Sequence, residues 1–195
     1  MLVLNELVIA TKNQGKLKEF QSMLQGVAMV IRSLPEDFVM PEETGSTFQE
    51  NSLIKADAVS RALQLPALAD DSGLMIDALG GEPGVYSARY GGEGLDDKGR
   101  NQLLLRQLKN VSWEKRTAKF VAALTLVWPN GKRIDALGEC LGMILPEPKG
   151  DHGFGYDPIF YYPPFGRSFS ELTIEEKNEI SHRMIALQHL LQQLR

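Results

Sequence analysis

The sequence predicts an α/β fold in which helices flank a mixed β-sheet that contains a long antiparallel hairpin. An apolar run at residues 7–10 leads through a polar loop into a helical pattern, which makes a strand–loop–helix unit. Apolar residues at every second position from Phe120 to Trp128 predict a strand with one buried face. Pro129-Asn130-Gly131-Lys132 follows as a hairpin turn. Helical spacing recurs in other segments, so strands and helices both occur along the whole chain.

The first predicted unit carries a candidate phosphate site. Residues 7–10 form a strand, Thr11-Lys12-Asn13-Gln14-Gly15-Lys16 form a polar loop, and apolar spacing from Leu17 predicts a helix that ends near Gly26. Backbone N–H groups at such a helix start face an anion, and Lys16 adds a full charge. Residues 27–33 are a candidate second strand.

The same loop is not a P-loop. Ala10 and Leu17 stand where that motif needs a glycine and a serine or threonine. Taken alone, the pattern is equally consistent with lysines that only solvate the helix start. Cations at this end oppose the helix dipole, however, which favours a bound anion.

The second predicted helix begins with a capping box. Thr47 and Glu50 have the spacing of that motif, and the helix should run to about Leu65. Asn51 and Lys55 lie one turn apart on it, so they share a face.

Two pairs of acidic residues are candidate metal ligands. Residues 67–69 predict a short strand that delivers Asp70 and Asp71 at its C-terminal end, where adjacent side chains point to opposite faces. Glu42 and Glu43 lie in an acidic turn. A magnesium ion binds one or two carboxylates together with substrate phosphates, so these pairs matter if the fold brings them together. Otherwise Asp70 and Asp71 belong to a turn or a helix cap, and the two glutamates are solvated.

The chain from residue 79 onwards predicts further turns, strands and helices. A capping box at Thr173 and Glu176 precedes a final helix with one apolar stripe at Ile180, Met184, Leu187, Leu191 and Leu194. The other elements are a turn-rich loop at 79–84, a helix over 96–108, a return strand through Ile134, Ala136 and Cys140, a glycine-rich loop at 150–157 and a short strand at 159–161.

Two clusters in this part of the chain are candidates for base recognition. Aromatic residues between glycines in Phe154-Gly155-Tyr156-Asp157 can stack on a base, or they can form a tight corner with a buried ring. Lys177, His182 and Arg183 occur within two helical turns and can contact phosphate and a base edge, or they can lie on a solvated helix surface. His152 and His189 are expected on the surface.

Composition excludes several classes of protein. The chain has 195 residues, a net charge of −4 and no basic stripe, so a nucleic-acid polymer is not an expected partner. One cysteine, Cys140, makes no internal disulfide, which is typical of a reducing compartment. The sequence contains no apolar run as long as a membrane span and has no signal-peptide pattern at its start. We therefore expect a soluble, cytoplasmic protein without a membrane partner.

The order of the candidate blocks along the chain is more specific than any one of them. The blocks are Thr11-x-Asn13-x-x-Lys16; Glu42-Glu43-Thr44-Gly45 with Thr47-Phe48-x-Glu50-Asn51 and Lys55-Ala56; Ala69-Asp70-Asp71-Ser72-Gly73-Leu74; Leu79-Gly80-Gly81-x-Pro83-Gly84-x-Tyr86-Ser87-Ala88-Arg89; Phe154-Gly155-Tyr156-Asp157-Pro158-Ile159-Phe160; and Glu176-Lys177-x-x-Ile180-Ser181-His182-Arg183. Over nearly the whole chain they strongly resemble the inosine triphosphate pyrophosphatase family, the noncanonical purine NTP or dITP/XTP pyrophosphatases.

That resemblance implies a fold, an activity and a set of site residues. It implies one two-lobed domain over residues 1–195 with a nucleotide cleft between the lobes, acting as a homodimer. It implies Mg²⁺-dependent hydrolysis of ITP, dITP and XTP to the monophosphate and pyrophosphate. The catalytic positions are Asp71, Lys16, Lys55 and Asp70, and the metal positions are Asp71 with Glu42 or Glu43. The substrate-binding positions are Thr11, Lys12, Asn13, Gln14, Gly15, Lys16, Asn51, Ser72, Phe154, Gly155, Tyr156, Asp157, Lys177, His182 and Arg183.

The chemistry of these residues agrees with that activity. Lys16, Lys55 and Lys177 with Mg²⁺ neutralise phosphate charge, while Asp71 orients or deprotonates water. A donor from Arg183 suits the 6-keto oxygen of hypoxanthine, and adenine would leave it unpaired at a cost of about 1–3 kcal/mol. Two alternatives remain: a nucleotide-binding regulator without turnover, and a pyrophosphatase for pyrimidine or modified nucleotides.

Overall fold

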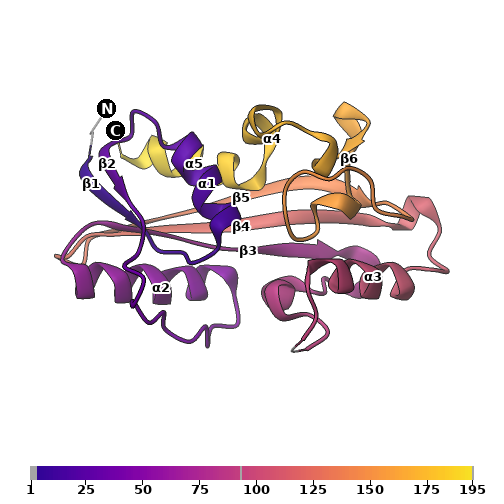
Figure 1. Cartoon of the computed structure of the whole chain (residues 1–195), viewed down its shortest axis with the longest axis horizontal. Helices are drawn as coiled ribbons and strands as arrows, with labels where there is room; N and C mark the ends of the chain where they lie inside the picture. The colour runs from indigo at the N-terminus through magenta and orange to yellow at the C-terminus, as the bar shows by residue number, and fades with distance from the viewer. Residues whose placement is uncertain (1–3, 93, 195) are drawn as a thin grey trace. The chain divides into compact units, whose positions relative to one another are not determined.

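The computed structural model of the chain describes residues 4–92 and 94–194. Within these ranges the fold is α/β, with a sheet of seven strands in the order β2-β1-β3-β4-β5-β6-β7 (Figure 1). The pairs β1–β2 and β1–β3 are parallel, whereas β5–β6 and β6–β7 are antiparallel, so the sheet is mixed as the sequence predicts. The strands are β1 Leu4–Ile9, β2 Ala28–Arg32, β3 Ala67–Ile76, β4 Thr117–Val127, β5 Arg133–Ile144, β6 Phe160–Tyr162 and β7 Arg167–Ser168.

Five α-helices occur in the described part of the chain, and the first three begin and end close to their predicted positions. The five helices are α1 Gln14–Met23, α2 Phe48–Leu63, α3 Asp97–Gln107, α4 Ile174–Ile180 and α5 His182–Gln193. Both predicted capping boxes are confirmed, at Thr47 with Glu50 and at Thr173 with Glu176. The predicted hairpin turn is confirmed as well, because the Trp128 N–H donates to the Lys132 carbonyl oxygen and closes the turn between β4 and β5. No helix in the described part of the chain is long and apolar enough to cross a membrane.

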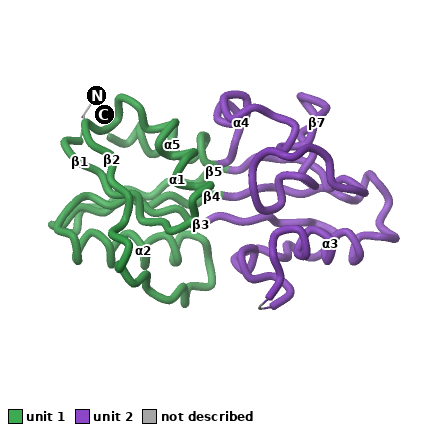
Figure 2. The backbone as a smooth tube through the Cα atoms, in the orientation of Figure 1, with its two compact units in different colours: residues 1–71, 122–138, 183–195 green, residues 72–121, 139–182 purple. Residues whose placement is uncertain are grey.

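The chain forms two compact units (Figure 2). Unit 1 comprises Met1–Asp71, Ala122–Gly138 and Arg183–Arg195, and unit 2 comprises Ser72–Val121 and Glu139–His182. The boundaries fall inside β3, β4 and β5, so these three strands contribute residues to both units.

In unit 1, helices cover both faces of the sheet. Leu7 of β1 packs in one apolar cluster with Phe20 of α1 and Leu187 of α5, while Val8 packs in a second cluster with Val59 of α2. Figure 1 shows the same arrangement, with α2 on one side of these strands and α1 and α5 on the other. Successive residues of a strand point to opposite faces, so a continuous apolar run in β1 is what this burial requires.

Unit 2 has its own core, which is rich in aromatic rings. Leu104 of α3 packs with Leu74 of β3, Phe120 of β4 and Phe160 of β6 in one buried cluster. Phe120 and Phe160 have ring centroids 4.4 Å apart, and Phe160 contacts Phe169 edge-on at 4.8 Å. This core supports the segments around residues 154–157 and 177–182.

Two predictions about strands are wrong. The sequence predicts one buried face for β4, but every residue from Phe120 to Val127 is buried, because helices and neighbouring segments cover both sides. Asp70 and Asp71 were expected at the end of a three-residue strand. They lie in the interior of β3, which continues to Ile76 because Leu74 and Ile76 join the core of unit 2.

The single final helix predicted over the last apolar stripe is also wrong. The chain is extended at Ser181, with φ −69° and ψ 153°, so α4 ends at Ile180 and α5 starts at His182. The physical reason is that the apolar residues of this stripe pack in two different hydrophobic cores. Ile180 packs against the cluster of unit 2, whereas Leu187 and Leu194 belong to the cluster of unit 1.

Candidate functional site

The polar loop after β1 forms the start of α1. The Asn13 N–H donates to Thr11 Oγ1 at 3.1 Å, and Asn13 Oδ1 accepts from the Lys16 N–H at 3.0 Å as the helix cap. The helix therefore begins at Gln14, so Gln14, Gly15 and Lys16 form its first turn and not part of the loop. The first N–H groups of a helix have no intrahelical acceptor, which leaves this turn suited to an anion. Lys12 is exposed beside it.

The side chain of Lys16 joins a buried charge cluster in unit 1, made of Lys16, Glu19, Asp70 and Arg183. Lys16 Nζ lies 2.8 Å from Asp70 Oδ2, Arg183 Nε lies 3.1 Å from the same oxygen, and Arg183 Nη1 lies 2.9 Å from Glu19 Oε2. Two positive and two negative charges meet here, and each buried charge has a partner of the opposite sign. Burial alone would raise the pKa of Asp70, but Lys16 and Arg183 hold that pKa well below its usual range.

A second group of charges meets at Lys55, and we call it the Lys55 bridge: Glu43, Lys55 and Asp71. Lys55 Nζ donates to Glu43 Oε1 at 2.7 Å and to Asp71 Oδ1 at 3.1 Å. Glu43 is therefore the acidic-turn residue that the fold brings to Asp71, while Glu42 is exposed. Burial raises the pKa of Asp71, and the neighbouring Lys55 only partly offsets that effect. The pKa of Lys55 is raised because the two carboxylates outweigh its desolvation.

Asp71 keeps one oxygen available. Its Oδ2 atom is buried and has no hydrogen-bond partner among the described residues. An unpaired buried acceptor is costly, so such an atom suits a ligand or a water that the site is built to receive. The predicted opposite orientation of adjacent carboxylates agrees with the contacts, because Asp70 pairs with α1 and α5 residues and Asp71 pairs with an α2 residue.

Asn51 supports the acidic turn from the same face of α2 as Lys55. Its Oδ1 accepts from the Gly45 N–H at 2.8 Å, and its Nδ2 is buried without a hydrogen-bond partner in the described part of the chain. A Cβ at Gly45 would lie 2.6 Å from Asn51 Oδ1, so the close approach requires glycine. Ser72 follows Asp71 in β3 and is half-buried.

In unit 2, residues 154–157 form a tight loop that we call the aromatic loop. Asp157 Oδ2 accepts from the Phe154 N–H at 3.0 Å and from Lys177 Nζ at 2.5 Å. Lys177 lies over the Phe154 ring at 5.0 Å from its centroid. Both members of this ion pair are almost completely buried, with side-chain exposures of 5% for Lys177 and 4% for Asp157.

The two aromatic residues of the loop differ in their exposure. Tyr156 is buried, and its hydroxyl donates to the Ser87 carbonyl oxygen at 2.7 Å. Burial raises its pKa. Tyr156 is thus a ring in a tight corner, whereas Phe154 is half-buried and keeps part of its surface accessible.

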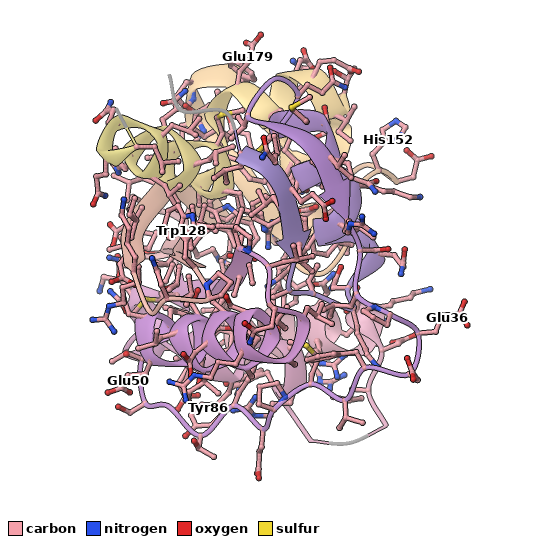
Figure 3. All side chains as sticks on the ribbon, turned by 90° about the vertical axis from the view of Figure 1, so that its left-hand side faces the viewer. Glu36, Glu50, Tyr86, Trp128, His152 and Glu179 are labelled. Carbon is pink, nitrogen blue, oxygen red and sulfur yellow. The ribbon has the colours of Figure 1, made fainter. Side chains whose placement is uncertain are left out.

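Lys177, His182 and Arg183 are all buried, so the alternative of a solvated helix surface is wrong. Lys177 and His182 belong to unit 2, and Arg183 belongs to unit 1. The His182 ring stacks on Phe120, with centroids 4.8 Å apart. His152 and His189 are exposed as predicted, and His152 projects away from the ribbon in Figure 3.

Sequence reasoning missed one member of the buried charge cluster, Glu19. It follows Lys16 by three residues on α1, and that spacing places both on one helix face. The spacing was the available signal, but a glutamate there is usually solvated. Only the fold shows it buried against Arg183. No group of three or more His, Cys, Asp or Glu side chains that could hold a metal ion occurs among residues 4–92 and 94–194.

Comparisons with known proteins match the chain over almost its full length. The profile of the Ham1 family matches residues 7–193. A relative from Halalkalibacterium halodurans, named dITP/XTP pyrophosphatase, is 48% identical over 189 residues, covering 96% of this chain and 97% of the relative. A HAM1 protein from Coxiella burnetii has a similar structure, with a TM-score of 0.86, 42% identity and 98% of each chain covered. The Ham1 protein of Staphylococcus aureus superimposes with a TM-score of 0.84, at 41% identity and 97% coverage of each chain.

Proposed function

This chain belongs to the Ham1 family, and from that membership together with the charged groups of unit 1 we propose that it is a nucleoside triphosphate pyrophosphatase. It hydrolyses noncanonical purine nucleoside triphosphates, namely ITP, dITP and XTP, to the monophosphate and pyrophosphate. The observation that carries the proposal is the Lys55 bridge, in which a buried lysine holds Asp71 while one oxygen of that carboxylate stays unpaired. The names of the relatives support the same reaction.

Asp71 is the proposed general base. The attacking water gives up a proton to the Asp71 carboxylate as its oxygen attacks the α-phosphorus and the pyrophosphate leaves. Burial raises the pKa of this carboxyl and so makes it a stronger base than an ordinary aspartate. Lys55 keeps Asp71 in place from the other side through Oδ1.

Positive groups around the triphosphate oppose its charge. Lys16 is partly exposed and stands in the first turn of α1, next to the exposed Lys12. Residues 11–16 therefore supply helix N–H groups and lysine charge for the phosphates. The Lys16 side chain is held by its ion pair with Asp70, which also pairs with Arg183, and Arg183 in turn pairs with Glu19. Asn51 adds its buried Nδ2 donor, and Ser72 its hydroxyl, as further polar contacts.

The residues present fit a divalent cation, which we propose to be Mg²⁺. Asp71 Oδ2 is an orphaned buried acceptor, and Glu43 is the second carboxylate directed at the same lysine. Two carboxylates are what Mg²⁺ takes from a protein when substrate phosphates complete its coordination. When bound, the ion neutralises phosphate charge and helps the pyrophosphate to leave.

The aromatic loop and the segment that follows α4 are the proposed base-binding residues. Phe154 offers a partly accessible ring, and Lys177 with Asp157 fixes the loop beneath it. His182 and Arg183 are the proposed donors for the 6-keto oxygen. Adenine carries an amino group at that position and would leave such a donor unpaired, at a cost of about 1–3 kcal/mol.

We also propose that the whole chain works as a single functional domain and acts as a homodimer. It is expected in the cytoplasm, with small nucleotides as partners and no nucleic-acid polymer. The net charge of −4 and the single cysteine support the solution environment. Light scattering at the elution peak of a gel-filtration column tests the dimer, and a mass of one chain would contradict it.

The decisive experiment measures pyrophosphate release from ITP, XTP, GTP, ATP and dUTP, each with and without Mg²⁺. Release from ITP and XTP alone, and only with the metal, is the expected result. Asp71→Asn should abolish it, while Glu36→Gln should not, because Glu36 is exposed and its side chain projects away from the ribbon (Figure 3). Activity on dUTP alone would favour a pyrimidine pyrophosphatase. Binding of ITP without any turnover would favour a regulator.

A further inference from the structure

Helix α3 binds the middle of the aromatic loop from outside. The Gly155 N–H donates to Asp97 Oδ2 at 2.8 Å, and the Gly155 carbonyl oxygen accepts from Asn101 Nδ2 at 3.0 Å. Asp97 and Asn101 are four residues apart on α3, so they lie on one helix face. Both backbone polar groups of one glycine are therefore satisfied by two side chains of a helix more than fifty residues earlier in the chain.

The loop needs such anchors because it has little regular structure of its own. Gly155 has φ +61°, a left-handed conformation, and it lies in neither a helix nor a strand that would pair its N–H and C=O groups. Its neighbours are held separately, Phe154 through Asp157 and Tyr156 through the Ser87 carbonyl. The peptide groups on both sides of Gly155 thus determine how the Phe154 ring is presented.

The two anchors differ in their surroundings. Asn101 is 4% exposed, and its Oδ1 has no hydrogen-bond partner among the described residues. Its bond to Gly155 is thus its one described side-chain hydrogen bond, and the Asn101 end of that bond is shielded from solvent. The Asp97 side chain is 59% exposed and lies 3.8 Å from Arg100. Asp97 is the solvent-screened member of the pair and its replacement should not endanger folding.

We propose that Asn101 and Asp97 are positioning residues for base recognition. They do not contact the substrate; they hold Gly155 so that Phe154 lies at the correct height and angle for the purine. This inference rests on the proposed function, because it assumes that the aromatic loop receives the base. It adds α3, which no block of the sequence motif includes, to the parts of the chain that determine selectivity.

The test compares Asn101→Leu and Asp97→Ala with the wild type and with Gln102→Ala. Leucine matches the shape of asparagine without its donor, and Gln102 is an exposed residue of the same helix. KM for ITP should rise about two- to tenfold in both test variants, the range expected for one lost hydrogen bond, with kcat nearly unchanged. The ratio of kcat/KM for ITP over GTP should fall. Gln102→Ala should match the wild type.

Inhibition by pyrophosphate separates positioning from general damage. Pyrophosphate has no base, so its inhibition constant should be the same in all four proteins if α3 acts through the aromatic loop. Unchanged KM and unchanged selectivity in folded variants would overturn the inference, as would a parallel loss of pyrophosphate affinity. If Asn101→Leu does not fold, Asp97→Ala decides the question alone.

A dissociation constant for ITP, measured by calorimetry with Asp71→Asn in every protein, makes the inference independent of turnover. If the protein without any substitution releases no pyrophosphate from ITP but binds it, the proposed activity fails. Weaker binding of ITP by the α3 variants in the calorimetry would then still support the inference. If ITP binds equally to all variants, the inference fails while the activity stands.

Discussion

Lys177→Met should lower the free energy of unfolding by about 3–5 kcal/mol, the usual cost of removing one partner from a buried ion pair. Lys177 Nζ and Asp157 Oδ2 are 2.5 Å apart, and both side chains are at most 5% exposed. Methionine keeps the length and the apolar packing of the lysine stem. The decrease in the free energy of unfolding therefore measures the removal of the charge and not the creation of a cavity. Asp157 would then be a buried carboxylate that has lost its ion pair with Lys177.

The magnitude follows from the contacts that remain and those that disappear. Asp157 keeps the Phe154 N–H at 3.0 Å, which stabilises the carboxylate only in part. The contacts of the lysine with the Phe154 and Phe169 rings, at 5.0 and 5.6 Å, are lost as well, and each contributes about 0.5–2 kcal/mol. For a chain of this size, a loss of about 3–5 kcal/mol lowers Tm by roughly 6–20 °C.

Urea unfolding of a double-mutant cycle tests this reasoning. Asp157→Asn in the Lys177→Met background removes the carboxylate charge and should recover part of the lost stability, so the coupling between the two positions should be about 1–3 kcal/mol. Lys115→Met, an exposed change in the same unit, should stay within about 0.5 kcal/mol of the wild type. A Lys177→Met variant as stable as Lys115→Met, or strictly additive effects of the two changes, would refute the argument.

Three further outcomes follow from the same structure. Glu43→Gln should raise the Mg²⁺ concentration that gives half-maximal activity about tenfold or more. Glu42→Gln should raise it much less, because only Glu43 shares Lys55 with Asp71. Equal effects of the two substitutions in a metal titration would contradict this assignment. Burial opposes ionisation of Asp70, but Lys16 and Arg183 lower its folded pKa, so its contribution to stability is present above the unfolded pKa of about 3.9 and is lost as pH falls below it. Unfolding free energies between about pH 6 and about pH 3 should therefore decline less in Asp70→Asn than in the wild type, and parallel curves would count against the ion pairs. Burial raises the pKa of Cys140 to about 12, so the buried neutral thiol contributes fully to stability below the unfolded thiol pKa of about 8.5, and this contribution is lost as pH rises towards 12. Ellman's reagent at about pH 8 should therefore label Cys140 only when the protein unfolds. Rapid labelling of the native protein would be the contrary result.

Local signals in the sequence determined most of the secondary structure. The capping boxes at Thr47 and Thr173, the turn at 129–132 and the apolar run of β1 are each set by residues within one turn or one strand of each other. Such signals act through nearby backbone groups and need no distant partner. The ordered motif blocks likewise determined the family, because residue identity and order suffice for that comparison.

Burial and pairing were decided by the tertiary structure. Whether β4 buries one face or two depends on what packs against it, and β3 extends past Asp71 because its later residues join a second core. The break at Ser181 arises for the same reason, since the apolar stripe on either side of it serves two clusters. The periodicity of apolar residues indicates which face of a helix or strand is buried, but it does not indicate the core in which that face packs.

The candidate site shows the same division. The sequence singled out Asp71, Lys55 and the two glutamates of the acidic turn, but only the fold distinguishes Glu43, bound to Lys55, from the exposed Glu42. Glu19 and Asn101 escaped notice because a glutamate or an asparagine on a helix is usually solvated. Their partners, Arg183 and Gly155, lie 164 and 54 residues away along the chain. Contacts between residues so far apart depend on how the helices pack on the sheet, and no local pattern in the sequence encodes them.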